Sequence, residues 1–69
     1  MTFADYVALV EQRQAEQPTW REGQTYFNVL YDHRPDLSEL VRATVLDPFH
    51  DADIVPDFLV FVAAHWDSV

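Results

Sequence analysis

The fold of this chain is decided by residues 19–35, Thr-Trp-Arg-Glu-Gly-Gln-Thr-Tyr-Phe-Asn-Val-Leu-Tyr-Asp-His-Arg-Pro. Thr19 and Glu22 have the spacing of a capping box, in which each side chain satisfies an exposed backbone amide at the start of a helix. Apolar residues then recur at helical spacing, and Pro35 disfavours helical geometry at Arg34. The stretch therefore predicts a helix over about Trp20–His33.

An amphipathic helix is predicted before this stretch. Thr2 and Asp5 have the spacing of an N-cap and its partner, and apolar residues follow at helical intervals over about Phe3–Glu16. Pro18 pushes Gln17 out of helical geometry and so ends the helix.

Two further helices are predicted after it. Asp36 and Glu39 repeat the capping spacing and open a short helix that ends at about Thr44, with Leu40 among its core residues. The last helix spans about Val55–Trp66 and is apolar around most of its circumference. We therefore expect it at the centre of the bundle.

The connection between these two helices contains the turn-forming residues Asp47 and Pro48, and we expect Asp47 to cap a turn there while Phe49 fills the core. The only glycine, Gly23, lies on the apolar stripe of its helix, where a close helix crossing would explain it. No strand pattern appears. The prediction is a single all-α domain over residues 1–69, a compact bundle of three main helices plus one short helix. Its expected core is Phe27, Leu30, Val41, Phe49, Phe58, Leu59 and Val62.

Composition limits how the fold can be stabilised. The chain has 69 residues and no cysteine, so neither disulfides nor a thiolate zinc site can support a domain of marginal size. Packing must do so, and 49% of the residues are hydrophobic. No basic segment precedes an apolar run and no run is long enough to span a bilayer, so we expect a soluble, cytoplasmic protein.

The charge of the chain disfavours nucleic acid as a partner. Four arginines stand among twelve acids, a net charge of −8, and phosphate binding needs basic residues. Residues 20–44 have the spacing of a helix-turn-helix, but the second helix offers one arginine beside an acid. Residues 35–69 hold seven acids and one arginine, so we expect the stronger negative field there.

One segment suggests metal binding. Asp47, His50, Asp51 and Asp53 lie within seven residues and are hard or borderline ligands. The spacing does not match a calcium-binding loop, and turn and helix capping explains the aspartates more simply. We therefore predict no metal site and no cofactor.

No catalytic constellation appears in the sequence. His33 and His65 fall in the last turns of predicted helices, where the helix dipole favours a cation. A bundle of this size also offers little volume for a ligand pocket of roughly 300 Å³ or more. We predict that the protein is not an enzyme and assign no catalytic residue.

Several segments together resemble a known group of proteins. These are Trp20–Asn28, the Arg-Pro-Asp-Leu of residues 34–37, the Asp-Pro-Phe of residues 47–49, and the stretch from Ile54 to Trp66. The chain resembles small uncharacterised acidic proteins of actinobacteria and their phages. The resemblance implies an intracellular or phage origin, and it implies no functional residue because no activity is attached to these proteins.

The sequence favours a non-catalytic interaction protein, phage-encoded by resemblance, that binds a protein partner with a basic surface. Nucleic-acid mimicry would be the extreme form of this function. The alternative is a small metal-dependent or enzyme-accessory factor that uses residues 47–53. Convergence of the acids and His50 would favour this alternative, and their dispersal along a capped turn would favour the interaction protein. The candidate interface consists of Tyr26, Asp36, Glu39, Asp51, Asp53 and Asp57.

Overall fold

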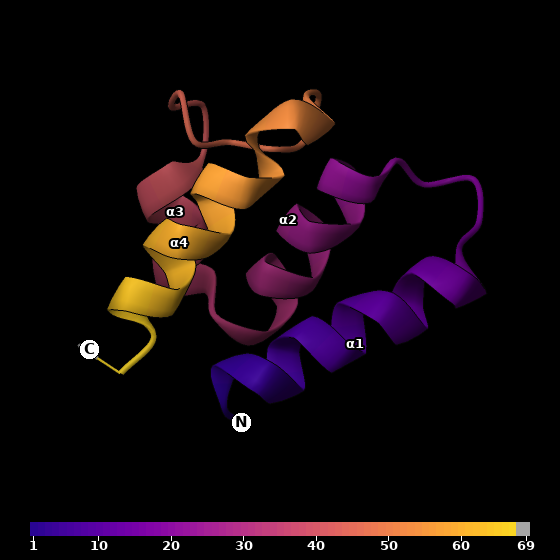
Figure 1. Ribbon diagram of the computed structural model, residues 1–69, viewed down its shortest axis with the longest axis horizontal. Helices are drawn as coiled ribbons and strands as arrows, with labels where there is room; N and C mark the ends of the chain where they lie inside the picture. The colour runs from indigo at the N-terminus through magenta and orange to yellow at the C-terminus, as the bar shows by residue number, and fades with distance from the viewer. Residues whose placement is uncertain (68–69) are drawn as a thin grey trace.

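The computed structural model describes residues 1–67, which form helices and connecting turns without any strand (Figure 1). Three main helices and one short helix pack together, as the sequence predicts. They are α1 (Phe3–Glu16), α2 (Glu22–His33), α3 (Pro35–Val41) and α4 (Val55–His65), and a single 3₁₀ turn, η1 (Ala52–Ile54), precedes α4.

Helix α2 occupies the middle of the arrangement. It packs against α1 on one side and against α3 on the other, while α4 packs on α3 and η1 (Figure 1). The expectation that the last helix lies at the centre is wrong. Phe58 and Val62 of α4 are fully buried, but Val60 on the same helix is 71% exposed, so one side of α4 faces solvent despite its apolar sequence.

The core lies where α2 meets its neighbours. Of the predicted core residues, five are buried, and Phe49 and Leu59 are partly buried against them. The prediction that Leu40 belongs to the core is wrong, because this residue is 55% exposed. Helix α3 is short and buries the face that carries Leu37 and Val41, which leaves Leu40 on its outer side. The five buried residues of the prediction are Phe27, Leu30, Val41, Phe58 and Val62.

The start of α1 is the predicted capping box. The amide of Asp5 donates to Thr2 Oγ1 at 3.1 Å, and the amide of Thr2 donates to Asp5 Oδ2 at 3.0 Å. The helix ends at Glu16, with Gln17 outside helical geometry, as expected before Pro18.

The start of α2 differs from the prediction. Helical geometry begins at Glu22 rather than Trp20, and Arg21 is the N-cap residue in place of Thr19. The reason is a tertiary contact, because Gln14 Nε2 on α1 donates to the carbonyl of Trp20 at 2.8 Å. This bond fixes the chain in a non-helical turn, and the amide of Arg21 is satisfied by Gln24 Oε1 at 3.2 Å.

Gly23 is required by a loop and not by a helix crossing, which corrects the expectation. A Cβ placed on Gly23 would overlap the carbonyl oxygen of Pro48, in the connection before η1. The backbone of that connection therefore rests directly on the first turn of α2, and only glycine leaves room for it.

Helix α3 ends at Val41 instead of Thr44, because the chain reverses at Ala43. Ala43 has a φ of 58°, in the left-handed region that non-glycine residues rarely adopt. Two side chains hold the reversal. The hydroxyl of Thr44 donates to the carbonyl of Val41 at 2.6 Å, and Asp47 Oδ2 accepts from the amide of Ala43 at 2.8 Å.

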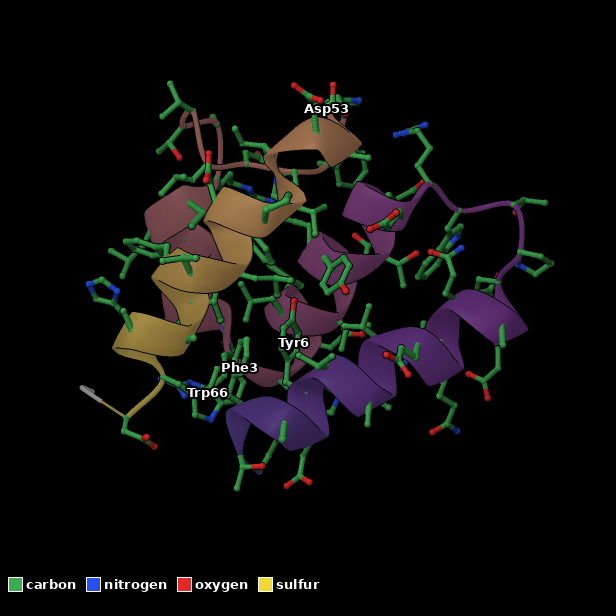
Figure 2. All side chains as sticks on the ribbon, in the orientation of Figure 1. Phe3, Tyr6, Asp53 and Trp66 are labelled. Atoms are coloured by element: carbon green, nitrogen blue, oxygen red, sulfur yellow. The ribbon has the colours of Figure 1, made fainter. Side chains whose placement is uncertain are left out.

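An aromatic cluster joins the start of α1 to the end of α4. Phe3, Tyr6 and Trp66 point toward one another there (Figure 2), with ring centroids 5.4–6.0 Å apart. The hydroxyl of Tyr6 donates to the carbonyl of Tyr26 on α2 at 2.7 Å, and Trp66 Nε1 donates to the carbonyl of Met1 at 3.1 Å. The cluster therefore ties three helices and both ends of the described chain together.

Candidate functional site

The aspartates of residues 47–53 act mainly as caps. Asp47 Oδ1 accepts from the amide of Phe49 at 3.0 Å, in addition to its bond to the reversal after α3. Asp51 Oδ1 accepts from the amide of Asp53 at 3.0 Å and caps η1. Two of the three carboxylates that a metal site would need are thus already bound to the backbone.

His50 does not join these acids in a ligand set. Its ring lies edge-on against Phe49, with centroids 4.8 Å apart. No group of three or more histidine, aspartate or glutamate side chains within residues 1–67 has the arrangement of a metal site. These side chains are instead dispersed along a capped turn.

The predicted interface residues come from several elements of the fold. Asp36 and Glu39 lie on α3, Asp51 and Asp53 in the turn at η1, and Asp57 in the first turn of α4. Asp53 lies at the opposite end of the molecule from the aromatic cluster (Figure 2). The sixth predicted residue, Tyr26, belongs to another site on α2.

Internal ion pairs occupy the two acids of α3. Asp36 accepts two hydrogen bonds from Arg34, at 3.0 and 3.1 Å, and this contact lowers the pKa of Asp36. Glu39 lies 3.3 Å from Arg42. These two carboxylates are therefore less available to a partner than the exposed acids Asp53 and Asp57, for which the described chain provides no ion pair.

All four arginines of the chain are engaged in internal contacts. Three lie over aromatic rings, and three form ion pairs, so the basic groups are directed toward the protein itself. Their partners are Glu16 and Asp32 for Arg13, Phe49 for Arg21, Asp36 and Trp66 for Arg34, and Glu39 and Tyr31 for Arg42.

An open groove of about 480 Å³ lies between α1 and α2. This volume exceeds what the sequence suggested for so small a bundle, because the two helices diverge toward the 17–21 connection, where Figure 1 shows them farthest apart. Val10, Glu11 and Gln14 line it from α1, and Glu22 and Tyr26 line it from α2. Val10 is buried and Tyr26 partly buried, so the groove has an apolar floor with carboxylates at its edges.

Electrostatic coupling links the groove carboxylates to the phenol of Tyr26. Partial burial raises the pKa of Tyr26, and the negative charges of Glu22 and Glu11 raise it further because they disfavour a phenolate. Neither glutamate forms an ion pair or a side-chain hydrogen bond with any residue in the described part of the chain. The groove is therefore lined by two carboxylates without an ion pair and by an aromatic ring.

Sequence reasoning identified Tyr26 but missed Glu11 and Glu22. In the sequence, Glu11 falls on the polar face of the first amphipathic helix, and Glu22 belongs to a predicted capping box that does not form. Only the packing of α1 on α2 brings them to one groove. The one available signal was that Glu22 and Tyr26, four residues apart, share a helix face.

Comparison of the chain with protein-family models, with curated proteins and with solved structures finds no match in any of the three. No helix among residues 1–67 combines the length and the apolar character needed to cross a membrane.

Proposed function

We propose that the protein is a non-catalytic, cytoplasmic interaction protein that binds a protein partner with a basic surface. The observation that carries the proposal is the distribution of charge. The four arginines are used within the fold, whereas Glu11, Glu22, Asp53 and Asp57 are exposed acids for which residues 1–67 provide no ion pair. A net charge of −8 on this surface accelerates encounter with basic partners and disfavours acidic ones, nucleic acids included.

The resemblance to actinobacterial and phage proteins favours a phage-encoded protein whose partner is a host protein. We do not propose the metal-dependent alternative, because Asp47 and Asp51 already accept backbone hydrogen bonds and His50 packs on Phe49.

The test begins with affinity capture from the cells that encode the chain, followed by identification of the captured protein by mass spectrometry. The association rate of the purified pair is then measured at low and high salt. An electrostatically steered complex should associate roughly 10-fold or more faster at low salt. Asp51→Asn with Asp53→Asn should also slow association, while asparagine preserves the cap at η1. A salt-independent rate that this double variant leaves unchanged would contradict the proposal.

A further inference from the structure

The groove between α1 and α2 combines three groups that suit a cation. Glu22 and Tyr26 project from the same face of α2, and Glu11 approaches from α1. Both carboxylates line the groove together with Tyr26, and their charges raise the pKa of its phenol. Gln14 completes the lining, but its amide is bound to Trp20 and Thr25 and therefore belongs to the framework.

The fold contains two examples of an aromatic ring and a carboxylate that together bind an arginine. Arg34 lies over the Trp66 ring, 4.8 Å from its centroid, and binds the Asp36 carboxylate at 3.0 Å. Arg42 repeats the arrangement at 5.9 Å from the Tyr31 ring, with Glu39 as its carboxylate at 3.3 Å. Twice in the fold, therefore, an arginine of the chain lies over an aromatic ring and pairs with a neighbouring carboxylate.

The groove contains the same combination without an arginine. Arg21, which precedes Glu22, is directed away from the groove, since its guanidinium lies over the Phe49 ring and donates to the Phe49 carbonyl at 3.4 Å. Within residues 1–67, no other basic side chain pairs with Glu11 or Glu22.

We propose that this groove binds a single arginine side chain of the protein partner, with the guanidinium between Glu11 and Glu22 and against the Tyr26 ring. This inference rests on the proposed function and names the group that is recognised. The methylenes of the arginine lie along the partly exposed Tyr26 side chain, which gives the inserted side chain an apolar contact as well as a charge contact.

Arginine fits this groove better than lysine does. Its guanidinium is planar, stacks on aromatic faces and presents several donors at once, so it can bind two carboxylates from opposite walls. An ammonium group is more strongly hydrated and acts as a point charge. The cation–π contribution at an exposed site corresponds to about a two- to fivefold gain in affinity.

The test uses isotope-labelled protein and three blocked tripeptides, acetyl-Gly-Arg-Gly-amide and its lysine and glutamine counterparts, titrated by NMR at constant ionic strength. The arginine peptide should give saturable shifts at the amides of Val10, Glu11 and Tyr26. The lysine peptide should bind more weakly, and the neutral peptide should leave these amides unchanged. Absence of saturable binding, or equal binding of the glutamine peptide, would overturn the proposal.

Two pairs of variants locate the site. Glu11→Gln with Glu22→Gln should weaken binding of the arginine peptide about tenfold, since it removes both charge contacts. The matched control, Asp53→Asn with Asp57→Asn, removes the same charge from exposed acids outside the groove and should leave the affinity close to wild type. An equal loss in both variants would show diffuse attraction to the acidic surface and would refute a defined site.

A second pair tests the aromatic ring. Tyr26→Phe keeps the ring and should retain the preference for arginine over lysine, whereas Tyr26→Leu should reduce it. Thermal melting checks that each variant is folded before titration. A preference and an affinity that Tyr26→Leu leaves unchanged in the folded protein would exclude the ring from the site.

The peptide experiment is independent of the partner. If the arginine peptide fails to bind but the captured partner still associates in a salt-dependent manner, the arginine site in the groove is refuted and the proposed function stands. If the peptide binds the groove but the captured complex ignores salt and surface charge, the proposed function is wrong.

Discussion

Raising the pH above 10 is expected to destabilise the protein through Tyr6. The side chain of Tyr6 is 0% exposed, and its hydroxyl donates to the carbonyl of Tyr26 at 2.7 Å. Burial raises the pKa of Tyr6 far above its usual value, because a phenolate in this position would lose its hydration and the proton that it donates. The folded state therefore holds this proton at a pH where the unfolded chain releases it.

The sign and size of the effect follow from this difference. Above the unfolded pKa of about 10 the folded state binds one more proton, so stability is fully present below this pH and falls as the pH rises. The slope for one proton approaches about 1.4 kcal/mol per pH unit, and the total loss reaches about 2.7 kcal/mol at pH 12. That is roughly half the total stability of a domain with about 5 kcal/mol.

Urea denaturation followed by far-ultraviolet circular dichroism, at a series of pH values from 8 to 12, measures this slope. Tyr6→Phe should lower stability by about 1 kcal/mol at pH 8, through the lost hydrogen bond, and should reduce the slope above pH 10 by about 1.4 kcal/mol per unit. Tyr31→Phe, at a position that is 49% exposed, is the matched control and should keep the wild-type slope. Parallel losses of stability in wild type and Tyr6→Phe above pH 10 would refute the reasoning.

Three other variants test features of the fold and the groove. Gly23→Ala should destabilise by about 1–3 kcal/mol in urea denaturation, since its Cβ would overlap a loop carbonyl, and a gain in stability would show that the loop yields freely. Ala43→Gly should raise stability by about 0.5 kcal/mol, because relief of left-handed strain exceeds the entropy that glycine loses. A lower melting temperature for that variant would show that the left-handed conformation of Ala43 is not strained. Glu11→Gln with Glu22→Gln should lower the pKa of Tyr26, measured by NMR titration of the ring carbons. An unchanged pKa would show that these carboxylates do not act on the phenol.

Local signals in the sequence predicted most of the fold. Apolar residues at helical spacing located every helix, and the Thr2–Asp5 box and Pro18 gave the limits of α1. The start of α2 could not be predicted in the same way. Thr19 and Glu22 have correct local spacing, but Gln14 binds the carbonyl of Trp20 from another helix, and this tertiary hydrogen bond determines the backbone.

The candidate groove could not be predicted from the sequence for a related reason. Its carboxylates belong to different helices, and each had a sufficient local explanation, Glu11 as a solvated face and Glu22 as a cap. Which residues of two helices meet depends on packing angle and register, and these are set by buried contacts such as the one between Tyr6 and Tyr26. The role of Gly23 was similarly hidden, because the carbonyl that approaches it belongs to residue 48.

The hydrogen bond from Trp66 to the Met1 carbonyl has a consequence for how this unit can be connected to other chains. At 3.1 Å it places the backbone at residue 1 beside the end of α4, and Figure 1 shows the start of α1 and the end of α4 on the same side of the molecule. A short linker can therefore join them, and the ring so formed can be reopened in the exposed 17–19 turn to give a circular permutant. By the same geometry, the unit can be inserted as a cassette into a surface loop of a host protein, without spreading the two sides of that loop.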